Sequence, residues 1–409
     1  MGALSAISRR MGTRALNLGT SLALRAGFRE QRRIIGPGSL LCLPQALSRM
    51  GVTSVLIVTS SGMVRRGTIE PLQRALKVSG IAASVYSDVK PDPTVACVEK
   101  GLASYQEGCC NGIVALGGGS AIDCAKAIGM RVANPGLTIP QMRGVMRVHG
   151  MLPPLVAVPT TAGTGSEVTA AAVITDVVDG RDCKYPISDS RLVPRLAVLD
   201  AQLTLGLPPE VTAYSGMDAL SHAVEAYVNR FCPPVASEAA LEAVGLVFSN
   251  LPRVMDDPSD LEARECMLTA SYGGGLALTN AFVGYVHALA HGIGALYDIP
   301  HGRAIASVMP VVLEAYGSAA HARLAQLSHA AGVGDPNLPD DQNAARLIEG
   351  IRSLNERLGI PAHIERLDPT DFDLLADRAL EEATPWYPVP VIWGHEQMVE
   401  VLERLLPGA

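Results

Sequence analysis

The sequence predicts an α/β half followed by an all-helical half, and two observations carry this prediction. Between residues 52 and about 200, apolar strand-like segments alternate with amphipathic helical segments, which is the pattern of βαβ units and a parallel sheet. After residues 203–213 the strand-like segments disappear, and helical periods dominate to the C-terminus. We therefore expect an extension over 1–30, an α/β domain over 31–205 and a helical domain over 206–409.

Each element follows from a local pattern. In the first half, the apolar segments predict strands, which are expected at 52–60, 81–89, from 111 into a run of glycines, and at 154–158, 171–176 and 196–199. Amphipathic segments predict the helices between them, at 67–80, 93–108 and 121–130. In the second half, helical periods are clearest at 216–228, 237–251, 260–279 and 395–406.

Composition excludes several classes of protein. Hydrophobic residues make up 48% and charged residues 18% of the 409 residues, as in an ordinary globular chain. The net charge of −7 argues against a nucleic-acid binder, which needs a basic face. Eight cysteines are scattered without any C-x-x-C pair, which favours buried thiols in a reducing compartment over a disulfide framework. We therefore expect a cytoplasmic protein.

The first thirty residues differ from the rest, because they carry five arginines before their first acid, Glu30. Apolar and basic residues alternate there at roughly helical spacing. Three interpretations compete: a transit-like peptide, a helix that contacts a membrane surface, and a helix that packs on the domain. No apolar run is long enough to span a bilayer. We favour a docked or surface-lying helix, and a weak membrane contact through 1–30 stays open.

Two small-residue turns follow predicted strands. In "IVALGGGSAIDCAK" (113–126) three glycines and Ser120 precede a helix. Glycines let a phosphate approach the backbone, the helix N-terminus offers free N–H groups, and Ser120 can cap the helix or bond a phosphate oxygen. The alternative is a tight turn without a ligand. This turn lacks the G-x-G-x-x-G fingerprint.

The second turn, "VAVPTTAGTGSEVT" (156–169), places threonine hydroxyls beside glycines. Small polar loops at two strand ends suit a ligand in the crevice of an open α/β sheet. A G-x-S-x-G nucleophile elbow is missing from the sequence, so a hydrolase of that type is excluded.

Three of the nine histidines lie in "GYVHALAHGIGALYDIPHG" (284–302). Imidazoles in an apolar segment need partners, and a divalent metal satisfies several at once. Upstream, Asp218 and His222 are also four residues apart, on one helix face. The structural alternative is an aspartate that complements the helix dipole and a His222 that pairs with Glu225. Together the two segments favour a metal, and the lack of H-E-x-x-H excludes a zinc protease.

These motifs are recognisable together. "GGGSAIDCAKA", "PTTAGTGSEVT", "LDAQLTLGLPP", "GMDALSHAVEAY" and the histidine-rich segment resemble, in this order, the motifs of the iron-containing (group III) alcohol dehydrogenases. The resemblance runs from about residue 34 to the end. "EATPWYPVP" (382–390) is similar to a C-terminal feature of one subgroup, whose members also carry an apolar N-terminal helix. The family implies a dehydroquinate-synthase-like fold: an N-terminal Rossmann-like nucleotide-binding domain, a C-terminal helical metal-binding domain, and an active site between them.

The resemblance also implies a set of site residues. The implied metal ligands are Asp218, His222, His287 and His301. His291 matches a histidine that faces the substrate and relays protons. The implied cofactor residues are Gly118, Gly119, Ser120 and Asp123 on the pyrophosphate and nicotinamide side, Thr160, Thr161 and Thr164 on the adenine and ribose side, and Asp92 and Lys184 nearby. Ser60 stands where many NAD-preferring relatives carry Asp, so NADP is expected to be accepted.

The expected function is hydride transfer between NAD or NADP and a small alcohol or aldehyde. A divalent metal, Fe²⁺ by resemblance and Zn²⁺ by ligand chemistry as the alternative, would act as a Lewis acid on the substrate oxygen. A homodimer is expected. Two alternatives remain: a dehydroquinate-synthase-like lyase that uses NAD, and a non-enzymatic nucleotide-binding protein at a membrane. Because the motifs begin after residue 30, removal of residues 2–30 is expected to leave activity intact.

Overall fold

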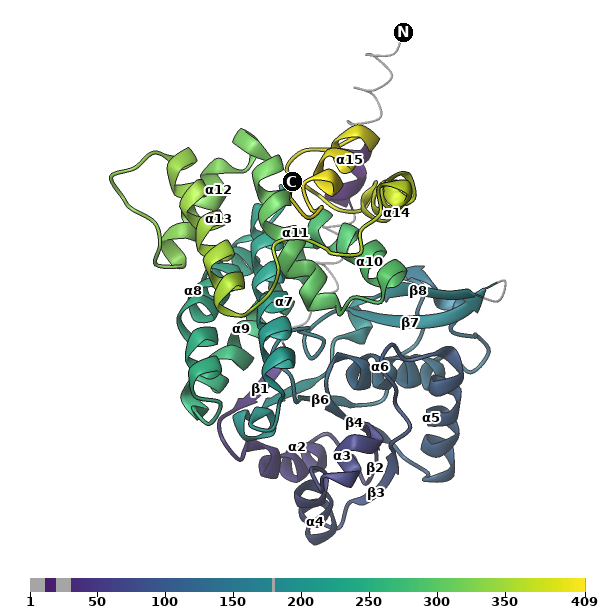
Figure 1. Cartoon of the computed structure of the whole chain (residues 1–409). Coiled ribbons are helices and arrows are strands. Elements are labelled where there is room, and N and C mark those ends of the chain that lie inside the picture. Colours follow the sequence, from purple (N-terminus) through teal and green to yellow (C-terminus); the bar gives the residue numbers. More distant parts are fainter. Residues whose placement is uncertain (1–11, 20–30, 179–180, 409) are drawn as a thin grey trace. The chain divides into compact units, whose positions relative to one another are not determined.

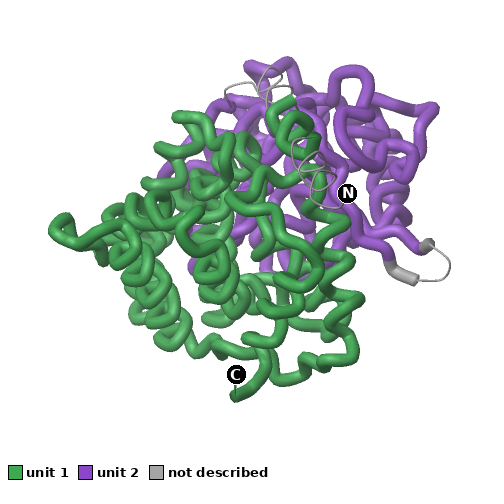
Figure 2. Tube along the Cα trace, turned by 90° about the horizontal axis from the view of Figure 1, so that it is seen from above, with its two compact units in different colours: residues 1–26, 208–409 green, residues 27–207 purple. Residues whose placement is uncertain are grey.

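The computed structural model describes residues 12–19, 31–178 and 181–408. The chain forms two compact units, shown in separate colours in Figure 2. One unit spans residues 27–207, and the other combines 1–26 with 208–409. The N-terminal segment is thus grouped with the helical unit, and the division between the units falls close to the predicted residue 205.

The main sheet of the α/β unit has six strands, all parallel, in the order β1-β9-β6-β4-β2-β3. Their bounds are β1 Arg32–Ile35, β2 Ser54–Val58, β3 Ala82–Tyr86, β4 Gly112–Gly117, β6 Leu155–Pro159 and β9 Leu196–Leu199. The parallel α/β arrangement that the sequence predicts is confirmed, although β1 was not among the expected strands.

Helices cover both faces of this sheet. Figure 1 shows α5 (Val95–Glu107) and α6 (Gly119–Ala133) on one side, and α2 (Leu43–Arg49) and α4 (Glu70–Val78) on the other. Alternate strand residues enter two separate cores, because successive side chains of a strand point to opposite faces. Leu56 and Val58 belong to the core under α5 and α6. The opposite core contains Ile57.

The strand order fixes where a ligand fits. Without the edge strand β1, the strands lie side by side in the order β3-β2-β4-β6-β9. If these five strands are numbered by their order in the chain, this is the order 2-1-3-4-5 of a doubly wound sheet. The winding direction reverses between β2 and β4, and ligands of such sheets bind outside the carboxyl ends of the strands at this switch point. The chain leaves β2 toward Ser60 and leaves β4 toward Gly118.

A second, smaller sheet has the order β5-β8-β7. It is formed by β5 (Gly144–Val145), β7 (Ala171–Val178) and β8 (Arg181–Ser188). The strand predicted at 171–176 exists as β7, but its expected place in the parallel sheet is wrong, because it pairs antiparallel with β8. Short helical segments complete this unit, namely η1 Ser39–Cys42, α3 Ser61–Arg65, η2 Pro140–Met142, η3 Ser190–Leu192 and η4 Ala201–Thr204.

The second unit is helical in its described part. Its main helices are α7 Pro209–Val228, α8 Pro234–Asp256, α9 Leu261–Ala281, α10 Tyr285–Tyr297, α11 His301–Ala315, α12 His321–Ala330, α13 Asp340–Arg357, α14 Phe372–Ala383 and α15 His395–Glu403. The single turns η5 Gly317–Ala319 and η6 Pro369–Asp371 lie between them, and residues 12–19 form one more helix.

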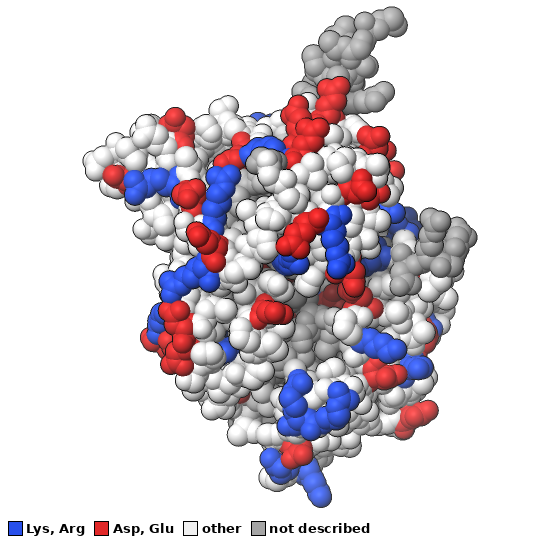
Figure 3. All heavy atoms as spheres, in the orientation of Figure 1, with Lys and Arg blue, Asp and Glu red and all other residues white. Residues whose placement is uncertain are grey.

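The described helices differ from membrane-spanning helices in length or in polarity. No single one is long and apolar enough to cross a bilayer, and α9 with α10 meets the requirement only as a pair bent by 107°. On the face drawn in Figure 3, acidic and basic side chains are interspersed over most of the described surface. This mixture agrees with the modest net charge of −7.

Candidate metal centre and cofactor site

Helix α7 carries two of the predicted metal ligands. Asp218 and His222 are one turn apart and therefore share a face, and both side chains are buried. Helix α9 packs closely against this part of α7. A Cβ atom added to Gly274 of α9 would lie only 2.8 Å from the backbone carbonyl oxygen of Ala219 in α7. Only a glycine lets the two backbones approach to this distance.

The other histidines come from α10 and α11. His287 and His291 are one turn apart on α10, and His301 is the first residue of α11. The position of His301 depends on Gly302, since a Cβ there would collide with the backbone oxygen of Tyr214 in α7. The first turn of α11 thus rests directly on the backbone of α7.

One carboxylate oxygen is the common neighbour of three imidazoles. Asp218 Oδ1 lies 3.6 Å from Nε2 of His222, 3.6 Å from Nε2 of His287 and 3.5 Å from Nε2 of His301. Asp218 Oδ1 and His287 Nε2 are buried without a hydrogen bond to any described residue. Such orphaned groups are costly unless a further atom satisfies them.

The spacing of these atoms fits a metal ion. Metal–ligand bonds of about 2.1 Å in tetrahedral geometry place ligand atoms about 3.4 Å apart, close to the separations found here. The candidate ligand atoms of Asp218, His222 and His287 all lie within 4.8 Å of one another. His301 joins them through its contact with Asp218, although its side chain is 38% exposed.

The charges of the cluster support one another. Burial alone would raise the pKa of Asp218, but His222, His287 and His301 hold it well below its ordinary value. Burial would lower the pKa of His287, yet Glu225 and Asp218 raise it to about 9. Burial lowers the pKa of His301. Asp218 is therefore a charged carboxylate, the form that binds a cation, whereas His287 has to release a proton before its Nε2 can bind one.

Glu225 orients His287, and the sequence did not reveal this role. Its Oε2 lies 2.5 Å from His287 Nδ1, and its Oε1 accepts a hydrogen bond of 2.8 Å from the backbone N–H of Val286. The contact fixes Nδ1 as the protonated nitrogen and leaves Nε2 facing Asp218, as in carboxylate–histidine–metal arrangements. The described contacts of Glu225 are with His287 and Val286, and its expected pairing with His222 stays a prediction. The available signal was the spacing, since Glu225 follows Asp218 by seven residues on the same face of α7.

His291 has different surroundings. Its Nδ1 lies 2.8 Å from Glu382 Oε1, and the hydroxyl of Tyr387 donates to the same oxygen at 2.9 Å. The imidazole of His291 stacks on that of His301 with ring centroids 5.1 Å apart, and its side chain is 39% exposed. It therefore borders the ligand cluster without facing Asp218.

The two small-residue turns of the α/β unit contact each other. A Cβ on Gly118 would lie 3.3 Å from Thr161 Oγ1, and one on Gly119 would lie 2.9 Å from Thr164 Cγ2. The backbone N–H of Thr160 donates to Gly117 at 3.0 Å. The structure thus brings most of the predicted phosphate-binding residues together at the carboxyl ends of β4 and β6.

Ser120 does not cap the helix, so that part of the prediction was wrong. Helix α6 begins at Gly119 with Gly118 as its N-cap residue, and no described side chain caps it. Ser120 already lies within the first turn. The N–H groups at the start of α6 therefore have no side-chain cap among the described residues.

The remaining predicted cofactor residues lie around these turns. Asp123 Oδ2 accepts a hydrogen bond of 3.0 Å from the N–H of Val173, and Asp123 Oδ1 lies 3.9 Å from Lys126 Nζ. Burial raises the pKa of Asp123 despite that lysine. Asp92 and Lys184 form an exposed ion pair of 2.5 Å, with Asp92 in the left-handed region at φ 50°.

Ser60 lies at the predicted end of the first strand. It is the N-cap residue of α3, with extended backbone, and its own side chain makes no capping hydrogen bond. Arg65 Nη1 donates to the hydroxyl of Ser61 at 3.1 Å. Arg65 therefore folds back over the beginning of α3, while Arg66 contacts the sulfur of Met63.

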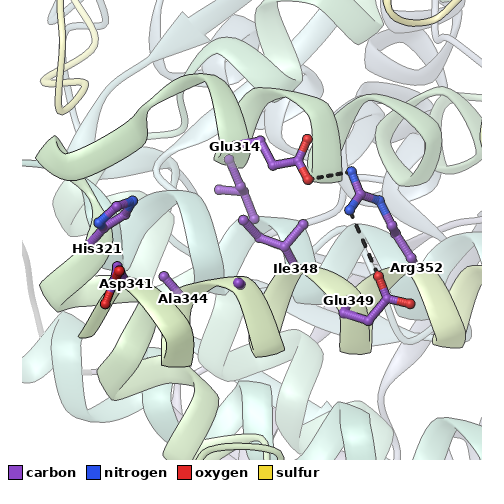
Figure 4. Close-up of a pocket in the computed structure, with 9 residues that line it drawn as sticks. Glu314, His321, Asp341, Ala344, Ile348, Glu349 and Arg352 are labelled. Carbon is purple, nitrogen blue, oxygen red and sulfur yellow. Dashed lines mark ion pairs between the residues drawn. The ribbon is translucent and has the colours of Figure 1, made fainter. Parts of the chain in front are cut away.

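A separate hollow of the helical unit contains no comparable cluster. It lies among α11, α12 and α13, where Glu314 pairs with Arg352 at 2.6 Å (Figure 4). Glu314 follows His301 by thirteen residues in α11, which places the two about 20 Å apart along the helix. The hollow is therefore distinct from the histidine cluster, and the carboxylate of Glu314 in it is paired with Arg352.

A nucleotide-binding type of sheet and a buried carboxylate–imidazole cluster, carried by two units of one chain, are typical of a metal-dependent oxidoreductase. Comparison with known families agrees with this class. The chain belongs to the iron-containing alcohol dehydrogenase family: residues 31–201 match "Iron-containing alcohol dehydrogenase", and residues 212–406 match the C-terminal part of the same family.

Individual relatives are similar over most of their length. The chain is 36% identical to the 1,3-propanediol dehydrogenase of Klebsiella pneumoniae over 85% of this chain and 90% of that protein. It is 35% identical to the NAD-dependent methanol dehydrogenase of Bacillus methanolicus over 85% of this chain and 91% of the relative. Among solved structures, an alcohol dehydrogenase from Oenococcus oeni matches with a TM-score of 0.88 and 32% identity, covering 92% of this chain and 99% of that one.

These findings confirm the predicted fold and the predicted class of function. The chain is an oxidoreductase of the alcohol dehydrogenase type, and alcohols fit its family as substrates. The two alternatives, an NAD-using lyase and a non-enzymatic membrane-associated protein, are not favoured by these matches.

Proposed function

We propose that the protein transfers a hydride between NAD or NADP and a small alcohol or aldehyde, with a divalent metal held by Asp218, His222, His287 and His301. The observation that supports this most directly is the orphaned Asp218 Oδ1, with three imidazole Nε2 atoms 3.5–3.6 Å away. One carboxylate and three imidazoles form a mixed oxygen and nitrogen set that suits Fe²⁺ or Zn²⁺. The family description favours iron.

When bound, the metal supplies Lewis acidity that polarises the substrate oxygen. The chain's own contribution is to keep the donors aligned. Glu225 holds the Nδ1 proton of His287 and so directs Nε2 toward Asp218. The burial of Asp218 and His287 excludes water from one side of the cluster, which strengthens electrostatic interactions there.

His291 is proposed as the proton-relay residue. Its Nδ1 donates to Glu382, so Nε2 is left free to accept a proton from an alcohol or to return one to the product oxygen. Partial exposure of the His291 side chain lets the proton continue to solvent. His291 borders His301 through ring stacking, so it lies beside the proposed ligand cluster.

The cofactor is proposed to bind at the carboxyl ends of the parallel strands. The N-terminus of α6 and the backbone of Gly118 and Gly119 suit the pyrophosphate, because they offer N–H groups and the positive end of the helix dipole. The other proposed cofactor residues are Ser60, Asp92, Ser120, Asp123, Thr160, Thr161, Thr164 and Lys184. NAD use is supported by the name of the Bacillus methanolicus relative.

A cytoplasmic homodimer is proposed as the working form. The described cysteines are not joined in disulfides, and thiols persist in a reducing compartment. The described helix 12–19 makes hydrogen bonds to its own chain, which supports docking rather than the membrane-surface alternative for this part. The rest of the segment 1–30 lies outside the described residues. Sedimentation at several protein concentrations tests the dimer.

The experiment that tests this function is a panel of short alcohols and aldehydes with NAD(H) and NADP(H). The protein is stripped of metal and reconstituted with Fe²⁺ or with Zn²⁺. We expect metal-dependent change in NAD(P)H absorbance at 340 nm with at least one alcohol–aldehyde pair. Metal-loaded protein that binds cofactor but turns over no substrate of the panel would contradict the proposal.

A further inference from the structure

The segment 384–390 connects α14 to α15 and carries three prolines. Proline has no backbone N–H, so this segment can donate few hydrogen bonds of its own. Its carbonyl oxygens still need donors when they are buried, and Pro388, Val389 and Pro390 are buried. A segment of this composition is therefore held in place by donors from elsewhere in the chain.

The N-terminal helix 12–19 supplies three of those donors. Arg14 donates to the carbonyl of Val389 at 2.7 Å and to that of Pro390 at 3.2 Å. Asn17, whose side chain is fully buried, donates from Nδ2 to the carbonyl of Pro385. Figure 1 shows this purple helix beside α15 in the yellow C-terminal part of the same unit.

A fourth donor comes from the end of α7, where the N–H of Arg230 donates to Pro388 at 2.8 Å. The carbonyls of the segment are thus fixed from two directions, by the chain after α7 and by the N-terminal helix. Removal of the N-terminal helix would leave Pro385, Val389 and Pro390 without these partners.

The same segment reaches the proposed relay histidine. Tyr387 lies within it and donates its hydroxyl to Glu382 Oε1 at 2.9 Å, while its N–H donates to Ala383 at 2.7 Å. Glu382 ends the last turn of α14 and holds His291 Nδ1 at 2.8 Å. Hydrogen bonds at both ends of this segment, linked through its backbone, therefore connect the N-terminal helix with Glu382 and His291.

We propose that the helix 12–19 clamps the segment 384–390, and that Glu382, supported by Tyr387, is thereby held as the positioning residue of His291. This rests on the proposed relay role of His291. Glu382 keeps the Nδ1 proton of the imidazole and so leaves Nε2 for the substrate oxygen. The N-terminal extension then belongs to the working enzyme, in contrast to the expectation that residues 2–30 are dispensable.

The first test concerns Glu382 itself. In the metal-loaded enzyme, Glu382→Ala should lower kcat by roughly 10- to 100-fold, the effect typical of losing an orienting partner, with unchanged metal content and a small change in KM. Glu382→Gln keeps a carbonyl acceptor for Nδ1–H and should recover most of the rate. The neighbouring exposed Glu381→Ala is the matched control and should behave as the wild type.

The second test concerns the clamp. Arg14→Gln and Asn17→Ala should each lower kcat, by roughly 10-fold, because a small displacement of a catalytic group is costly. Leu18→Ala on the same helix, at a side chain 43% exposed, is the control. When Arg14→Gln is added to Glu382→Ala, little further loss is expected, because changes that act through one group are not additive.

A measurement independent of turnover separates this inference from the proposed function. In Zn²⁺-loaded protein with ¹⁵N-labelled histidine, the signal that disappears in His291→Ala identifies this ring. We expect Nδ1 to be protonated in the wild type and the tautomer to shift toward Nε2–H in Glu382→Ala and, more weakly, in Arg14→Gln. Two results would overturn the inference. One is an unchanged signal of the His291 ring in Glu382→Ala. The other is a double variant whose loss of kcat equals the product of the losses caused by Arg14→Gln and Glu382→Ala alone. Absence of any dehydrogenase activity with a normal ring signal would instead contradict only the proposed function.

Discussion

Glu225 holds two parts of α10 with one carboxylate: Oε2 contacts His287 Nδ1 at 2.5 Å, and Oε1 accepts from the N–H of Val286 at 2.8 Å. The carboxylate is fully buried. It therefore fixes both the ring orientation of His287 and the first turn of the helix that carries it. In this arrangement the imidazole directs Nε2 toward Asp218, so that binding of a cation requires loss of the Nε2 proton but no rotation of the ring.

The first prediction concerns this carboxylate. Glu225→Gln keeps the side-chain shape but removes the charge that favours an Nδ1–H donor. We expect metal affinity to fall by roughly 10- to 100-fold, as measured by competition with a chelating dye. The exposed Glu242→Gln on α8 is the control. Equal affinities of the two variants would mean that Glu225 stabilises the helix but does not tune the metal site.

The second prediction concerns His291. His291→Ala should retain metal and lower kcat by roughly 10²–10⁴-fold, the usual contribution of general acid–base help. Metal content by mass spectrometry and steady-state kinetics on the same sample decide the matter. His321→Ala, a histidine of the distant hollow (Figure 4), serves as the control. Metal loss in His291→Ala would show that the ligands have been assigned to the wrong histidines.

The third prediction concerns cofactor choice. An aspartate at position 60 would bond the ribose hydroxyl of NAD and repel the 2′-phosphate of NADP. The side chain of Ser60 carries no such charge. Arg65 folds back onto Ser61 and so lies close to this position. We expect the wild type to accept NADP, and Ser60→Asp to move the ratio of kcat/KM values toward NAD. A wild type that already rejects NADP, with no change in Ser60→Asp, would place selectivity elsewhere.

The fourth prediction concerns pH and a buried carboxyl group. Both carboxylate oxygens of Glu167 are buried without a hydrogen bond to a described residue. Burial raises the pKa of Glu167 from 4.5 to about 7, although Lys126 opposes this. Below pH 4.5 the folded and unfolded states both hold the proton, whereas between 4.5 and 7 only the folded state does. Stability should therefore fall as pH rises through this window and then level off.

Glu167→Gln tests the predicted fall of stability with rising pH, because an amide cannot ionise. The variant should lose this pH dependence and be more stable than the wild type at pH 8, by up to about 3 kcal/mol, because ionising a carboxyl group whose pKa is raised from 4.5 to about 7 costs about 1.4 kcal/mol per pKa unit. Thermal unfolding at several pH values measures it, with the exposed Glu107→Gln as control. A variant less stable than the wild type at pH 8 would show that the charged carboxylate has a stabilising partner.

Much of the fold could be predicted because its signals are local. The buried strands β2, β4 and β6 are continuous apolar runs, and each is followed by a turn rich in small residues. The hairpin of β7 and β8 was missed for the opposite reason. Strand β8, "RDCKYPIS", mixes polar residues with a proline, so its apolar content is too low to indicate a strand. The Asp-Gly dipeptide at 179–180 was the available hairpin signal.

In the candidate site, too, some residues could be predicted from the sequence and others could not. Asp218 with His222 and His287 with His291 are pairs within single helices, so their spacing is visible in the sequence. Glu225 and Glu382 are separated by 62 and 91 residues from the histidines that they contact. Only the packing of α10 against α7 and α14 brings these carboxylates to the rings. The spacing places Glu225 on the same helix face as Asp218, but a single sequence does not show which histidine either carboxylate contacts.

The shared oxygen of Asp218 is central to the proposed metal centre, and a count of bound metal tests its role directly. Bound metal is counted by mass spectrometry after reconstitution with Fe²⁺ or Zn²⁺, in the wild type, in Asp218→Ala and in His287→Ala. We expect about one metal ion per chain in the wild type and nearly none in either variant, because loss of one of four ligands leaves an incomplete shell. Full metal content in a correctly folded Asp218→Ala would contradict the assignment of this cluster as the metal centre.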